Sequence, residues 1–76
     1  MDKGMLQSEK VLEFITFCVE MYAKKHHVSG RDVALLFEKN GVMKYLAEGY
    51  DVLHTQGESW LLQDISSFLE KRESKQ

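Results

Sequence analysis

The sequence contains no proline and only one cysteine, and each of these two features narrows the classes of fold and function. Proline interrupts helices because it lacks a backbone donor, so its absence favours continuous helices joined by short turns. A single cysteine cannot form an internal disulfide. Cys18 lies among apolar residues, a setting typical of a small packed side chain. Nothing in the cysteine content therefore requires an oxidising compartment.

Long apolar runs and a strong net charge are also missing. No run approaches the roughly 18 apolar residues needed to span a bilayer, and the first ten residues lack the apolar segment of a signal peptide. We therefore expect a cytoplasmic protein. The net charge of −2, with both signs spread along the chain, gives no general attraction for nucleic acid or anionic membranes. Membrane association is not expected.

The chain does have one long and mostly apolar segment near its start. Ser8 to His26 contains no glycine and is too long for a strand, which predicts a helix of about five turns. Its polar residues recur at spacings of four, three, four and four, so they share one narrow face. These residues are Glu9, Glu13, Thr16, Glu20 and Lys24. The pattern predicts burial over most of the helix circumference.

Further helices are predicted after this segment. Ser29 and Asp32 have the spacing of a capping box, which starts a helix at Gly30 or Arg31. Asn40-Gly41 ends that helix, because both residues tolerate the left-handed conformation. The later helices are expected over residues 42–49 and 58–71.

These segments predict an all-α domain, a compact bundle of four helices around a long, mostly buried first helix. A hydrophobic content of 43% is enough for a core and argues against disorder. We expect one domain over residues 8–72, with flexible ends at residues 1–7 and 73–76.

Residues 50–57 combine a phenol, a carboxylate, an imidazole and a hydroxyl within eight positions, the groups used in acid–base catalysis. A chain of 76 residues leaves little room for an enclosed pocket. The simpler interpretation is that Asp51, His54 and Thr55 hydrogen-bond to the backbone at a helix junction. We predict no catalytic residues.

The same segment also suits a protein-binding surface. Tyr50, His54 and Trp60 are aromatic residues of the kind that anchor interfaces. The predicted partner-binding residues are Tyr50, Asp51, His54, Thr55 and Trp60, together with part of the first helix. Whether residues 50–57 form a functional surface or a structural junction stays open at this point.

No metal or cofactor site is predicted. His26 and His27 are adjacent, so on a helix they point about 100° apart and cannot face one ion together. Cys18 lies about two turns away, too far for a tight set of ligands.

The two short helices joined at Asn40-Gly41 resemble a helix-turn-helix, an arrangement that reads nucleic acid in other proteins. The helix after it carries only Lys44 as a base, and the cluster Lys24, Lys25 and Arg31 lies elsewhere in the chain. Because phosphate contacts require lysine and arginine on the recognition element, the pattern disfavours nucleic-acid binding.

The chain resembles a family of small bacterial proteins, the domain of unknown function 3791. The resemblance spans residues 11–69, and its most specific parts are Ser29-Gly30, residues 36–38, Gly41-Val42 and residues 50–57. The family has no established activity, so the resemblance implies no catalytic residues. Its members are encoded near genes for ADP-ribosyltransferase-like proteins, which implies a role as a small, antitoxin-like partner.

We therefore expect a non-enzymatic helical module that binds another protein. A homodimer is a second expectation, because a domain of this size often completes its burial by self-association. The alternative function is a nucleic-acid-binding protein that regulates its own operon. An enzyme would require Asp51 and His54 to converge beside a pocket.

Overall fold

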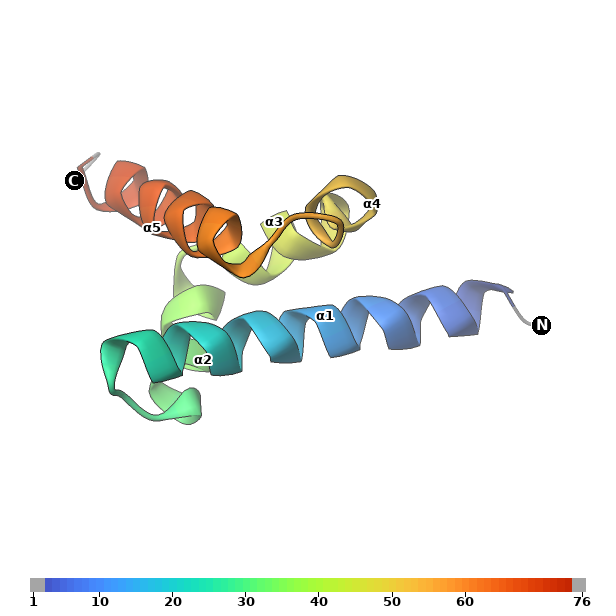
Figure 1. Cartoon of the computed structure of the whole chain (residues 1–76), viewed down its shortest axis with the longest axis horizontal. Helices are drawn as coiled ribbons and strands as arrows, with labels where there is room; N and C mark the ends of the chain where they lie inside the picture. Colours follow the sequence, from blue (N-terminus) through green and yellow to red (C-terminus); the bar gives the residue numbers. More distant parts are fainter. Residues whose placement is uncertain (1–2, 75–76) are drawn as a thin grey trace.

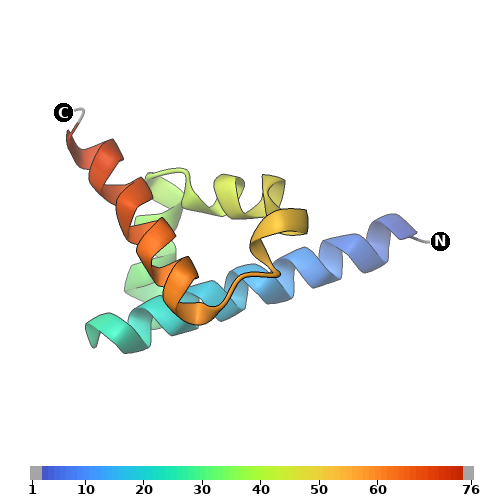
Figure 2. The ribbon, with the colours of Figure 1, turned by 45° about the horizontal axis from the view of Figure 1, so that its top comes forward.

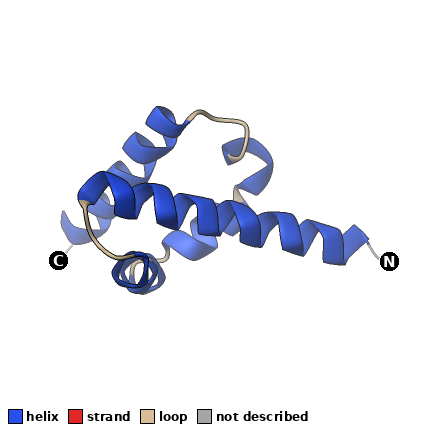
Figure 3. Ribbon diagram, turned by 60° about the horizontal axis from the view of Figure 1, so that its bottom comes forward, coloured by secondary structure: helices blue, strands red, loops and turns tan. Residues whose placement is uncertain are grey.

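The structure, a computed structural model, describes residues 3–74, and every regular element in that range is an α-helix (Figure 3). The expected all-α class is confirmed. Five helices are present, because the segment after Gly49 forms a short helix of its own. The helices are α1 (Lys3–His26), α2 (Gly30–Lys39), α3 (Val42–Glu48), α4 (Tyr50–Leu53) and α5 (Glu58–Ser74).

Local chemistry sets the limits of α2 as the sequence predicts. The Ser29 hydroxyl accepts a hydrogen bond of 3.0 Å from the backbone N–H of Asp32, which caps the first turn. At the other end, the side-chain amide of Asn40 donates a 3.0 Å hydrogen bond to the Leu36 carbonyl. Gly41 then takes the left-handed conformation with φ of 78°. The chain can therefore turn at once into α3.

Three of the helices, α3, α4 and α5, lie on one side of α1 in Figure 1. In that view α2 crosses behind α1 and leads the chain to the side where α3, α4 and α5 lie. Figure 2 shows the first turn of α5 beside the C-terminal half of α1, with α4 nearer to the middle of α1. Every helix contributes to the core, which consists of Phe14, Cys18, Ala23, Val33, Phe37, Val42, Leu46, Leu53, Leu61, Ile65 and Leu69.

The expected burial of the first helix over most of its circumference is wrong. Among the described side chains of α1, only Phe14, Cys18 and Ala23 are buried. Leu12 is 65% exposed and Phe17 is 43% exposed. The packing of α1 against α2, α3 and α5 leaves these two side chains open to water. The arrangement is therefore not a bundle wrapped around a central α1.

The boundaries at both ends differ from those expected. α1 begins at Lys3, before the expected start at Ser8, and α5 continues to Ser74. Residues 3–7 and 73–74 are helical, while residues 1–2 and 75–76 lie outside the described range. Crossing a membrane would require a longer apolar stretch than any helix in the described range offers.

Candidate interaction surface

The four residues of α4 place an aromatic pair beside α1. The Tyr50 and His54 rings, one helical turn apart, are stacked with centroids 4.2 Å apart and an angle of 6° between their planes. On α1, the Phe14 ring packs edge to face against the Tyr50 ring, with the two ring centroids 5.6 Å apart. Because Phe14 belongs to the core, this contact fixes the pair against the body of the protein.

Hydrogen bonds to the backbone hold the polar side chains of this segment. Nδ1 of His54 lies 2.6 Å from the carbonyl oxygen of Tyr50, and since a carbonyl only accepts, Nδ1 must carry the proton. The Thr55 hydroxyl donates a 2.7 Å hydrogen bond to the Val52 carbonyl. Asp51 is exposed in the first turn of α4. His54 and Thr55 thus act as local hydrogen-bonding residues at a helix junction, one of the two interpretations left open by the sequence.

A shallow hollow of about 260 Å³ lies between this aromatic pair and α1. It is lined by Lys10, Glu13, Phe14, Phe17, Tyr50 and His54. A second hollow, of about 410 Å³, follows toward the C-terminal end of α1. It is lined by Phe17, Glu20, Met21, Lys24, Lys25, Glu58 and Leu62.

Phe17 lines both hollows and therefore joins them into one surface along α1. We call this surface the α1 groove. Tyr50 and His54 lie at one end of it, Phe17 in the middle, and Met21 with Leu62 at the other end. Phe14 is the only lining residue that is buried, so the groove is shallow and open along its length.

Trp60 does not join the other predicted residues. It is 44% exposed and shares no hollow with Tyr50 or His54. Trp60 lines a hollow of about 280 Å³ with Gln63, Asp64 and Ser67. It also shares a hollow of about 550 Å³ with Leu62 and Lys25, which lie at the far end of the α1 groove. The structure therefore places Tyr50 and His54 at one end of the groove and Trp60 next to its other end.

Phe17 and Leu62 are groove residues that the sequence analysis missed. The pattern of the first helix predicts burial of its apolar residues, Phe17 among them, although Phe17 lies three positions before Glu20 and four after Glu13. Residues at these spacings share a helix face. The position of Phe17 beside these polar residues is therefore a signal in the sequence that it borders solvent.

Cys18 follows Phe17 in the chain, but its thiol is not a reactive group of the groove. Its side chain is fully buried, and burial raises the pKa of the thiol to about 12. The thiol is therefore protonated at neutral pH, which disfavours it as a nucleophile or a metal ligand. Within the described range, no three histidine, cysteine, aspartate or glutamate residues are grouped so that they could hold a metal ion.

Taken together, the geometry defines an all-α domain with an open, partly aromatic groove along its first helix. Residues 13–72 match the family described as protein of unknown function (DUF3791). This range covers most of the chain, so the chain belongs to that family, and the resemblance inferred from the sequence is confirmed. No curated protein and no solved structure matches the chain.

Proposed function

We propose that the chain is a non-enzymatic helical interaction module that binds another protein at the α1 groove. The observation that carries this proposal is the position of Phe17, which is 43% exposed and connects both hollows of the groove. A large aromatic side chain that is open to solvent within a groove has the properties of an interface anchor. Its neighbours Tyr50 and His54 are already held in place, which lowers the entropic cost of binding.

The shape of the groove supports a protein partner over a small molecule. Pockets for small molecules enclose most of the ligand surface. Here all lining residues except Phe14 are exposed or half-buried, so a small ligand would keep much of its surface in water. A partner helix or loop can instead lie along α1 and contact both hollows together.

The proposed partner is an ADP-ribosyltransferase-like protein, with the chain in an antitoxin-like role. This part of the proposal rests on the family resemblance and its gene neighbours, while the position of the binding surface rests on the groove. The two parts can therefore be tested separately, the first by identifying the partner and the second by substitutions.

The experiment is a pull-down of the tagged full chain from its native cell, with bound proteins identified and their affinity then measured. Phe17→Ala should weaken the binding of the recovered partner by about 2 kcal/mol, or roughly 30-fold in Kd. Tyr50→Ala should have a similar effect. Leu35→Ala is the matched control, because Leu35 is a 59% exposed leucine on α2 and lines neither hollow of the groove.

Equal binding by folded Phe17→Ala and Leu35→Ala variants would place the interface elsewhere. Trp60→Ala then distinguishes the second aromatic surface, since Trp60 shares no hollow with Phe17. Recovery of DNA in place of a protein, with binding that falls steeply as salt increases, would support the alternative function as a nucleic-acid-binding regulator.

A further inference from the structure

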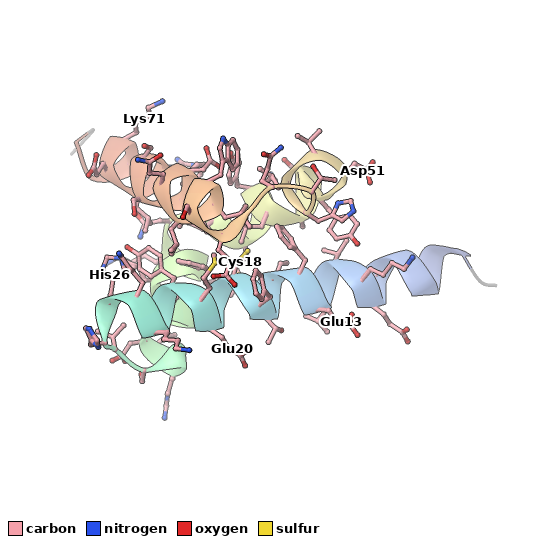
Figure 4. All side chains as sticks on the ribbon, in the orientation of Figure 1. Glu13, Cys18, Glu20, His26, Asp51 and Lys71 are labelled. Atoms are coloured by element: carbon pink, nitrogen blue, oxygen red, sulfur yellow. The ribbon has the colours of Figure 1, made fainter. Side chains whose placement is uncertain are left out.

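Four exposed residues form a stripe along α1, and all four also line the α1 groove. Glu13, Phe17, Glu20 and Lys24 follow one another at spacings of four, three and four, which keeps them on one helix face. We call these four residues the outer stripe. Figure 4 shows Glu13 and Glu20 pointing away from α3, α4 and α5. Leu12, 65% exposed, lines a hollow of about 330 Å³ on this side together with Glu13, Thr16, Phe17 and Glu20.

The charges along the outer stripe are arranged asymmetrically. Its carboxylates, Glu13 and Glu20, come first along the chain, and its only amine, Lys24, comes last. A second α1 helix running in the opposite direction would place its own Lys24 opposite Glu13, and its Glu13 opposite Lys24. The stripe is therefore complementary to a copy of itself related by a two-fold axis.

The same register also pairs the apolar residues. When Glu13 lies opposite Lys24 of a second copy, Phe17 lies opposite a position that is one residue from Met21 of that copy. This offset corresponds to about 1.5 Å along the helix axis. Met21 is half-buried and lines the same hollow as Phe17, so it faces the same edge of the stripe. Symmetry repeats both pairs. One register thus satisfies the charged pair and the apolar pair together.

We propose that two copies of the chain associate through an antiparallel contact of their α1 helices. Glu13 of each copy contacts Lys24 of the other, and Phe17 of each contacts Met21 of the other. The contact extends over about 17 Å of helix, from the rise of 1.5 Å per residue, so it belongs to the small interfaces below about 1,200 Å². The dimer is therefore weak, with a dissociation constant in the micromolar range or above. The dimer contact uses residues that also line the α1 groove, so a second copy and the heterologous partner would compete for this surface.

Glu20 sets a limit on the strength of this dimer. In the proposed register the two-fold axis passes between residues 18 and 19, so the Glu20 carboxylates of the two copies lie on either side of it. The two carboxylates carry the same charge and lie close together, so they repel each other. Removing this charge should therefore strengthen the dimer, a result that damage to the fold could not produce.

Sedimentation of the purified full chain over a series of concentrations tests the proposal. Glu13→Lys and Lys24→Glu should each weaken the dimer at least tenfold, while Glu20→Gln should tighten it about threefold. Glu38→Lys on α2 is the matched control and should leave the dimer unchanged, since Glu38 is exposed and lies away from the stripe. An equimolar mixture of the Glu13→Lys and Lys24→Glu variants should form a heterodimer, because each basic residue then faces an acidic one.

A chain that stays monomeric up to about 1 mM, the limit of weak but measurable association, would overturn the proposal. So would a dimer that the Glu13→Lys and Lys24→Glu variants form as readily as the wild type, or a mixture of the two that stays monomeric. These outcomes are separate from those of the proposed function. A monomer that still binds its partner through Phe17 would overturn only the dimer, and a dimer without a partner would overturn only the proposed function.

Discussion

The hydroxyl of Tyr45 donates a 2.5 Å hydrogen bond to a carboxylate oxygen of Asp64 and so connects α3 to α5. The ring of Tyr45 also stacks on Phe68, with centroids 4.6 Å apart, and the Arg72 guanidinium lies 5.0 Å from the centre of the Phe68 ring. Asp64, Phe68 and Arg72 are four residues apart, so they form a column on one side of α5. This column is the main set of polar and aromatic contacts between the two helices.

Removing the Tyr45 hydroxyl should destabilise the fold. Tyr45→Phe leaves the Asp64 carboxylate without this donor, and a hydrogen bond to a charged group contributes about 1.5 kcal/mol or more. Urea denaturation measures the loss. The same substitution in an Asp64→Ala background should lower the free energy of unfolding by much less, because the hydrogen-bond partner is already absent. Equal losses in both backgrounds would show that the hydroxyl acts through other contacts.

The stability provided by Tyr45 should also depend on pH. The hydrogen bond to Asp64, followed by burial and the charge of Asp64, raises the pKa of Tyr45 from 10.0 to about 12. Because the folded pKa is above the unfolded one, the contribution is complete below pH 10 and is lost as the pH rises through about 12. The difference in unfolding free energy between wild type and Tyr45→Phe should therefore shrink over this range. A difference in unfolding free energy that stays constant over this pH range would contradict the raised pKa of Tyr45.

Cys18 should resist thiol reagents in the folded protein. Its side chain is fully buried, and burial raises its pKa to about 12, so little thiolate is present and the reagent has no access. We expect labelling at neutral pH at least about 100-fold slower than at an exposed thiol, with fast labelling only after unfolding. The matched control is Thr16→Cys in a Cys18→Ala background, since Thr16 is exposed on the same helix. Similar rates at the two positions would refute the burial of Cys18.

Two glycines next to helix ends should respond to alanine with opposite signs. Gly41 has a φ of 78°, and an added Cβ would lie 3.2 Å from Nη2 of Arg72, so Gly41→Ala should destabilise by about 1 kcal/mol. Gly30 is in an ordinary helical conformation, with its nearest contact at 3.9 Å from Val19. Gly30→Ala should therefore stabilise by about 0.5 kcal/mol, through the reduced entropy of the unfolded chain. Thermal unfolding of both variants checks the pair, and a destabilised Gly30→Ala would contradict this account.

The limits of α2 could be predicted from the sequence because the interactions that set them are local. Ser29 bonds to a residue three positions away, and Asn40 bonds to one four positions away. The bonds of His54 and Thr55 to the backbone are equally short in sequence, which is why their role at a junction was predictable. Such contacts form in almost any tertiary arrangement that keeps the helices.

The candidate site could be predicted only in part. The segment with Tyr50 and His54 was singled out by its composition, but its neighbour Phe17 lies 33 positions before Tyr50 in the chain. That contact exists because α4 returns to the middle of α1. Its aromatic ring and its nearness in sequence predict Trp60 beside Tyr50 and His54, whereas in the structure it lines no hollow with either of them.

The sequence by itself determined the helical class, the turns around Ser29 and Gly41, and the family, since these depend on local hydrogen bonds, backbone conformation and residue pattern. Only the tertiary structure decided which side of α1 is buried. The first helix is apolar around most of its circumference, so several of its faces could have entered the core with similar hydrophobic gain. The packing of α2, α3, α4 and α5 against α1 placed Phe14 and Cys18 in the core, and left Phe17 and Leu12 exposed to water.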